Sequence, residues 1–259
     1  MASSSHLSSV RTGLLAYRRR GALALTAAAV ACLAVAGCGV GSSSSTSSAP
    51  ANPLATLTAK QIVAKSVADL RAAKSFTMTG SVTESGQTES LNLGYLNGKG
   101  CAGTVTEGTQ GSVAIVVIGT TAWIKPDNKF FQSTAGSQAS AAIALLNGRY
   151  LKGTTSNANV KSLTSVCDVT SLTSAFTATG TLVKGKVTTL NGQQVITVTD
   201  STKGGTLYAT NTATPQLVQI VNTKGEGGNT GQIKFNVGAK VTLTPPPASQ
   251  TVDGAAFGF

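Results

Sequence analysis

Cys38 is the residue of this chain with the most informative chemical setting. It follows five small or apolar residues, Leu33 to Gly37, at the end of a segment that carries no charge from Gly21 onward. Four arginines, at positions 11, 18, 19 and 20, precede that segment. A cationic region, an apolar stretch and then small residues are typical of a secretory signal. We therefore expect residues 1–37 to be an export signal that is cleaved before Cys38.

The four residues Val35-Ala36-Gly37-Cys38 resemble the lipobox of bacterial lipoproteins. The resemblance implies that the Cys38 sulfur carries a diacylglyceryl group and that acyl chains such as palmitate anchor the mature protein to the outer face of the cell membrane. Two or three chains make such an anchor durable. The alternatives are an ordinary cleaved signal and a transmembrane anchor, although 17 uncharged residues rich in alanine are marginal for spanning a bilayer. Export by the general or by the twin-arginine route stays open.

Two cysteines remain in the exported chain and are expected to form a disulfide. Cys32 leaves with the signal and Cys38 is acylated, so the pair is Cys101 and Cys167. Thiols in an oxidising compartment usually pair. The alternative is two separate buried thiols.

The exported chain lacks the residues that most enzymes use. Its only histidine, His6, lies in the signal, so Ser-His-Asp and Cys-His arrangements and imidazole zinc sites cannot form. A pair of carboxylates could still act together, but the nine acidic residues are widely spaced and are expected on the surface. No glycine loop that could cradle phosphate precedes a helix. We expect no enzyme activity, no metal and no cofactor.

The net positive charge of the exported chain favours binding to an anionic surface, and the distribution of its basic residues does not favour binding to nucleic acid. Four of the 20 Lys and Arg lie in the signal, which leaves 16 against 9 acidic residues, a net charge of +7. The basic residues are scattered singly, without interleaved aromatics, so the footprint of a nucleic-acid binder is missing. A general attraction to anionic lipid or cell-wall polymer follows.

Residues 38–56 are expected to be the lipidated cysteine and a flexible tether. The run Ser42 to Ser48, followed by Ala49-Pro50-Ala51-Asn52-Pro53, cannot bury a core. Residues 57–259 are then one folded domain, long enough for a single sizeable core.

The domain begins with an amphipathic helix over about 59–74. Thr58 and Gln61 form a capping box, and an apolar stripe runs through Ile62, Val67 and Leu70. Helices are also expected over 137–146 and within 160–176, and Pro245-Pro246-Pro247 is expected to end regular structure. Period-two alternation predicts the strands, with hairpin turns at Asn97-Gly98 and Asn191-Gly192. The expected strands cover about 76–83, 91–95, 101–107, 112–118, 121–124, 180–190, 193–199, 206–210, 216–221 and 232–237.

This order of elements predicts an α+β fold. Consecutive hairpins give an antiparallel meander, and alternating strands leave one apolar face that the helices must cover. A single strongly curved antiparallel sheet of about ten strands, a half-barrel wrapped around a few helices, satisfies the pattern.

The chain resembles actinobacterial lipoproteins of the LppX/LprG type, which share the half-barrel of the LolA type of carrier. The resemblance rests on the lipobox, the Ser-rich tether, the helix running into Ser75-Phe76, the segment Ala122-Trp123-Ile124-Lys125, and Gly205 to Ala209 followed by Pro215. It implies an apolar cavity between the sheet and its helices that holds the acyl chains of lipids in some members.

Two functions follow as hypotheses. In the first, the protein binds or carries a lipid or glycolipid between sheet and helices. In the second, a solid domain binds a cell-envelope protein or wall polymer through its outer sheet and the loop near Gly225 to Gly231. Each cavity residue of the first hypothesis is equally suited to an ordinary core. The candidates are Phe76, Met78, Leu93, Tyr95, Ile115, Trp123, Ile143, Leu146, Leu207 and Ile220.

Overall fold

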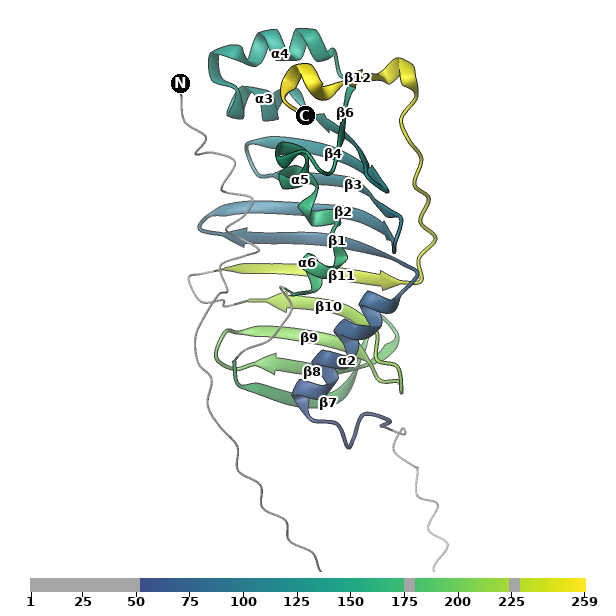
Figure 1. The fold of residues 1–259 in the computed structure, drawn as a ribbon. Helices are drawn as coiled ribbons and strands as arrows, with labels where there is room; N and C mark the ends of the chain where they lie inside the picture. The colour runs from purple at the N-terminus through teal and green to yellow at the C-terminus, as the bar shows by residue number, and fades with distance from the viewer. Residues whose placement is uncertain (1–51, 175–179, 224–228) are drawn as a thin grey trace, which may run out of the picture.

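The computed structural model describes residues 52–174, 180–223 and 229–259, and in them one curved sheet of twelve strands (Figure 1). The expected signal, Cys38 and most of the tether lie outside the described residues. The strands are β1 (Ser75–Glu84), β2 (Gln87–Leu96), β3 (Gly100–Glu107), β4 (Gly111–Ile118), β5 (Thr121–Pro126), β6 (Tyr150–Thr154), β7 (Leu182–Leu190), β8 (Gln193–Asp200), β9 (Gly205–Thr210), β10 (Leu217–Asn222), β11 (Thr230–Val237) and β12 (Thr251–Asp253).

The strand order is β12-β6-β5-β4-β3-β2-β1-β11-β10-β9-β8-β7. Two meanders meet where β1 pairs with β11, and every neighbouring pair is antiparallel except β12 with β6. The single curved sheet predicted from the sequence is confirmed, but it has twelve strands and is mixed. β6 and β12 were missed because they are short and are set between helical segments, so neither shows a run of alternation long enough to recognise.

Three helices lie across the concave face of the sheet (Figure 1). They are α2 (Ala59–Ala72), α5 (Ala158–Thr164) and α6 (Val169–Ser174), with the 3-10 turn η2 (Ser165–Cys167) joining the last two. The single helical patch expected within 160–176 is therefore divided. Asp168 adopts an extended backbone after η2 and interrupts the helical run, and its carboxylate accepts hydrogen bonds from Thr170 N and the Ser171 hydroxyl.

The first helix forms as its sequence predicts. Gln61 N donates to Thr58 Oγ1 at 3.2 Å while Thr58 N donates to Gln61 Oε1 at 2.8 Å, which completes the capping box. Ile62 and Leu70 are fully buried on its apolar face. The helix ends at Ala72, two residues earlier than expected, because Ala73 is already extended and leads into β1.

The predicted hairpin turns are present. Asn191 and Gly192 have φ of 51° and 79°, the left-handed pair of a type I′ turn between β7 and β8. Asn97-Gly98 lies in the three-residue loop from β2 to β3, where only Gly98 has a left-handed backbone, with φ of 71°. Within β3, Gly103 has φ of 152°, and a Cβ there would collide with Asn92 O of the paired strand, so only glycine permits this close and strongly bent pairing.

The chain between β5 and β6 forms two short helices that lie outside the sheet (Figure 1). They are α3 (Asn128–Thr134) and α4 (Ala139–Leu146), joined by the 3-10 turn η1 (Gly136–Gln138). The helix expected over 137–146 is confirmed in its C-terminal part, and α3 was not expected. Asp127 caps α3 by accepting a hydrogen bond from Phe130 N at 2.7 Å.

The chain after β11 crosses to the far edge of the sheet (Figure 1). Ser75 Oγ donates to Ala239 O at 2.8 Å, and Val241 lies against Gly94 on the convex face. The chain then forms η4 (Ala248–Gln250), β12 and η5 (Gly254–Phe257). The expectation that Pro245-Pro246-Pro247 ends regular structure is therefore wrong, because an extended proline segment can lead directly into an edge strand.

The folded domain starts earlier than the expected boundary at 57. Leu54 is buried in the core, and Lys184 Nζ donates to the carbonyl oxygens of Ala55 and Leu57 at 2.7 Å. Residues 52–56, which were assigned to the tether, therefore pack against β7. An apolar side chain next to prolines gave no periodic signal that could have revealed this contact.

Candidate functional site

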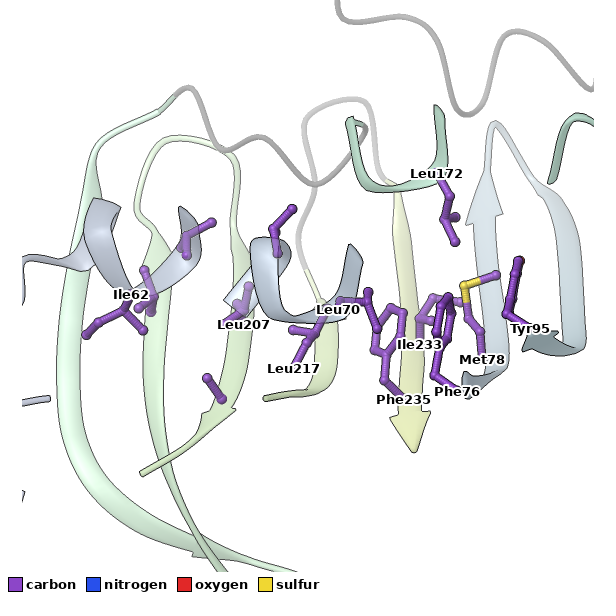
Figure 2. Close-up of a cluster of buried hydrophobic side chains, with 14 of the residues drawn as sticks. Ile62, Leu70, Phe76, Met78, Tyr95, Leu172, Leu207, Leu217, Ile233 and Phe235 are labelled. Atoms are coloured by element: carbon purple, nitrogen blue, oxygen red, sulfur yellow. The ribbon is translucent and has the colours of Figure 1, made fainter. Parts of the chain in front are cut away.

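The concave face of the sheet carries a continuous apolar surface. Phe76 and Met78 of β1 and Leu93 and Tyr95 of β2 point into it and are almost completely buried. The Phe76 and Tyr95 rings stack with centroids 4.4 Å apart. Figure 2 shows Phe76, Met78 and Tyr95 beside Phe235 and Ile233 of β11, so the two meanders share one apolar cluster.

Helix α2 fills the part of this face that lies over the second meander. Ile62 and Leu70 point from the helix toward Leu207 and Leu217 of the sheet (Figure 2), and all four are buried in one cluster. Native cores are packed at the density of organic crystals. In the described arrangement, the apolar surface under α2 is therefore covered by the protein's own side chains.

The layer formed by α5, η2 and α6 is joined to the sheet by a disulfide and a neighbouring hydrogen bond, which we call the clamp. The expected disulfide is present between Cys101 of β3 and Cys167 of η2. Beside it, the hydroxyl of Tyr95 donates to Val166 O at 2.9 Å, and Tyr95 is the register partner of Cys101. Burial raises the pKa of the Tyr95 phenol, so this hydroxyl stays protonated as a donor.

The structure separates the ten cavity candidates into four places. Phe76, Met78, Leu93, Tyr95, Leu207 and Ile220 belong to or pack against the main cluster, and Ile115 is buried in a second cluster under α5. Leu146 is buried and Ile143 half-buried on α4. Trp123 alone lines a pocket elsewhere on the molecule. The prediction of an inward-facing position is wrong for Trp123, because its neighbour Ile124 is the buried residue of β5 and Trp123 points to the opposite face. The sequence identified the other inward-facing strand positions but could not separate them by location.

Three carboxylates stand at the end of the concave face away from the clamp. Glu89 and Glu107 are register partners on β2 and β3, and Glu84 ends β1 with its Oε1 accepting from Asn229 Nδ2 at 3.4 Å. Burial, and then the charges of Glu107 and Glu84, raises the pKa of Glu89. Burial also raises the pKa of Glu107. Like charges opposite each other weaken the strand pair.

A pocket of about 710 Å³ lies at the β12 edge of the sheet. Trp123 and Lys152 are cross-strand partners on β5 and β6, and they alternate with the buried residues Ile124 and Leu151, so they face the convex side. The C-terminal segment closes the opposite wall of the pocket. Sequence reasoning missed these partners because they come from the two short strands and the chain end. The remaining lining residues are Thr121, Gly153, Thr154, Asn157, Pro246, Ala248, Thr251, Val252, Asp253 and Phe259.

The described part of the chain holds no candidate metal centre. Within 52–174, 180–223 and 229–259, no three His, Cys, Asp or Glu side chains gather as metal ligands would. Across those same ranges, every helix is too short or too polar to cross a bilayer.

Comparison with known proteins finds similarity in structure and none in sequence. No protein-family model and no curated protein matches the chain. The crystal structure of LprF from Mycobacterium bovis is similar over 73% of this chain and 96% of its own, with a TM-score of 0.49 and 15% identity. The crystal structure of the lipoprotein LppX from Mycobacterium tuberculosis is similar over 72% of this chain and 98% of its own, with a TM-score of 0.46 and 14% identity.

The complex of MucA and MucB from Pseudomonas aeruginosa is similar over 74% of this chain and 59% of the matched chain, with a TM-score of 0.33 and 12% identity. At these identities the likeness to all three structures is one of fold. The structures similar to this chain include mycobacterial proteins of the LppX/LprG type, the type that the sequence itself resembles.

Proposed function

We propose that this protein is an envelope lipoprotein, anchored through Cys38, that binds the apolar part of a lipid or glycolipid on the concave face of its sheet. One observation carries the proposal: a continuous apolar surface that runs across both meanders, beneath short helices. The buried residues of that surface extend from Phe76 on β1 to Leu207 on β9. The protein catalyses no reaction in this proposal.

A bound acyl chain has to replace contacts that the protein now makes with itself. The layer that contains η2 is fixed to β3 by the disulfide. In contrast, α2 is held by packing and by few polar contacts, among them Arg71 Nε donating to the Thr173 hydroxyl at 2.6 Å. The ligand therefore displaces α2 from the sheet and takes the place of side chains such as Ile62 and Leu70.

The test is to map where a lipid attaches to the protein. Residues 52–259 are incubated with a phospholipid whose acyl chain carries a diazirine, irradiated, digested and analysed by mass spectrometry. Adducts on β1, β2, β9 and β11 support the proposal. Native mass spectrometry of the chain made in a cell-wall-bearing host adds a second readout, because a co-purifying lipid supports the proposal and a clean apo mass contradicts it.

The anchor has its own test. A Cys38→Ala variant of the full chain lacks the sulfur to which the diacylglyceryl group attaches. We expect this variant in the soluble fraction or the medium, whereas the parent sediments with membranes. Equally firm membrane attachment of the variant would contradict the anchor without affecting the lipid-binding test, which uses the domain alone.

A second candidate function is a surface module that binds a wall polymer, and the position of the pocket favours it. The pocket lies on the convex edge of the sheet, and Trp123 offers an aromatic face beside Lys152 and Asp253. Binding of purified wall polysaccharide should be lost in Trp123→Ala and kept in Tyr208→Ala, a half-buried aromatic of β9 that is not in the pocket. Lipid adducts confined to the concave face, with no polysaccharide binding, would exclude this candidate.

A further inference from the structure

The helical hairpin α3–α4 has an unusual composition for an exposed element. From Phe130 to Gly148 the chain contains no charged residue. Yet α3 has no buried residue, and α4 buries only Ala139 and Leu146. An apolar helix in a soluble domain normally turns its stripe toward a core. Here Phe130 packs against the second apolar cluster and Leu146 is buried, but Leu145 is exposed and the apolar side chains of Phe131 and Ile143 are only partly covered.

Leu145 marks the centre of the hairpin's exposed apolar surface. It is 60% exposed, the highest value among the exposed large hydrophobic side chains of the described residues. Ile143 on the same helix and Phe131 on α3 are half-buried. An exposed apolar surface of this kind marks a site of contact with a partner or a membrane.

Cations flank the uncharged stretch of the hairpin on both sides, and Asp127 caps the start of α3. Residues 128–167 contain no carboxylate, although they contain four cations. Lys129 precedes the uncharged stretch and Arg149 follows it, and the Arg149 guanidinium donates to the carbonyl oxygens of Leu145 and Leu146 at 2.9 and 3.0 Å. The other two cations lie elsewhere, Lys152 in the convex pocket with Asp253 and Lys161 near Asp168. The cationic border complements a negatively charged surface.

We propose that the α3–α4 hairpin docks on an anionic phospholipid surface. An apolar helical face bordered by Lys and Arg lies in the plane of a membrane interface, with its apolar side chains among the acyl chains and its cations at the headgroups. Between Lys129 and Arg149 the hairpin offers no carboxylate that could pair with the cations of a protein partner. This contact is separate from the anchor at Cys38 and from the ligand on the concave face.

The hairpin and the tether lie at opposite ends of the sheet. The described chain begins against β7, where Lys184 binds the carbonyl oxygens of residues 54–57, while α3 follows β5 near the other edge. At about 4.8 Å per strand, nine strand spacings place them roughly 40–45 Å apart along the sheet. The two membrane contacts therefore act on different ends of the domain.

Vesicle sedimentation with residues 52–259, which contain the whole described sheet, tests the proposal. Vesicles of phosphatidylcholine alone are compared with vesicles that contain 30% phosphatidylglycerol. We expect binding to the anionic vesicles only, weakened about tenfold in Leu145→Gln, because that side chain leaves the acyl region. The matched control is Val183→Gln, since Val183 is 51% exposed on β7. Lys129→Gln should weaken binding about fivefold, and Lys65→Gln on α2 should not.

The outcomes separate this proposal from its alternatives. Absence of binding to anionic vesicles, or equal losses in Leu145→Gln and Val183→Gln, would overturn it. A concentration-dependent dimer in sedimentation velocity that disappears in Leu145→Gln would also overturn it, because a second copy then covers the hairpin. Leu145→Gln should leave the lipid adducts on the concave face unchanged, so failure here is distinct from failure of the proposed function.

Discussion

Breaking the clamp between η2 and the sheet should have a large and measurable effect on stability. The perturbation is the double variant Cys101→Ala and Cys167→Ala, which removes the disulfide across a sequence separation of 66 residues. By the loop-entropy relation, a loop of this length stabilises the folded state by about 4 kcal/mol at 25 °C. For a domain of this size, that corresponds to a decrease in Tm of about 8 to 16 °C.

Equilibrium unfolding in urea, followed by fluorescence of Trp123, measures the loss. The parent in the presence of a thiol reductant is the essential control, since it retains both sulfur atoms and loses only the covalent link. Cys101 is fully buried, so the alanine variant also loses packing and should be less stable than the reduced parent. A reduced parent within about 1 kcal/mol of the oxidised protein would refute the loop-entropy argument for this fold.

Tyr95→Phe tests the non-covalent half of the same clamp. The variant keeps the ring that stacks on Phe76 but leaves the buried carbonyl of Val166 without its donor. We expect a loss of about 1–2 kcal/mol. The loss should be smaller in the disulfide-free background, because η2 is then free to turn its carbonyl toward water. Equal losses in both backgrounds would show that the bond and the disulfide do not act on one element.

Two further predictions concern carboxylates. Glu89→Gln should stabilise the protein by about 0.2–1 kcal/mol at pH 7, because it removes repulsion from Glu107. Since folding raises the pKa of Glu89, the stability of the parent should fall as pH rises from about 4.5. Thermal unfolding between pH 4.5 and 7 should therefore give a flatter stability profile for the variant than for the parent. Burial raises the pKa of Asp127, but hydrogen bonds from Phe130 N and Ser112 outweigh it and lower the value overall. Asp127→Ala should therefore cost about 1 kcal/mol at pH 7, a difference that disappears as pH falls below about 4 and that pH-dependent unfolding would detect.

Local patterns in the sequence predicted the elements whose residues interact with near neighbours in the chain. The capping box at Thr58 and the Asn191-Gly192 turn depend on residues within four positions, so their outcome was fixed locally. The same holds for strand alternation, which identified Phe76 and Tyr95 as inward-facing. The disulfide followed from elimination of the other cysteines.

Contacts between distant parts of the chain were not predictable in this way. The pocket at Trp123 depends on β12, a three-residue strand about 130 positions later, and the burial of Leu54 depends on β7. The apolar run of α4 was assigned to the core because apolar helices usually pack inward. Only the position of α4 outside the sheet shows that Leu145 faces solvent.

The two proposed membrane contacts, the anchor at Cys38 and the α3–α4 hairpin, together constrain how the proposed carrier would lie on a membrane. The Ser- and Pro-rich composition of residues 38–51 predicts a tether that spans about 20 Å on average, which is less than the roughly 40–45 Å between residue 52 and the hairpin along the sheet. With Cys38 in the bilayer, the hairpin reaches the same surface only if the long axis of the sheet lies nearly parallel to it. Each contact raises the effective concentration of the other. Removing the apolar side chain of Leu145 should therefore let the domain swing away from the membrane while the anchor holds, a change that energy transfer from Trp123 to a headgroup dye would report.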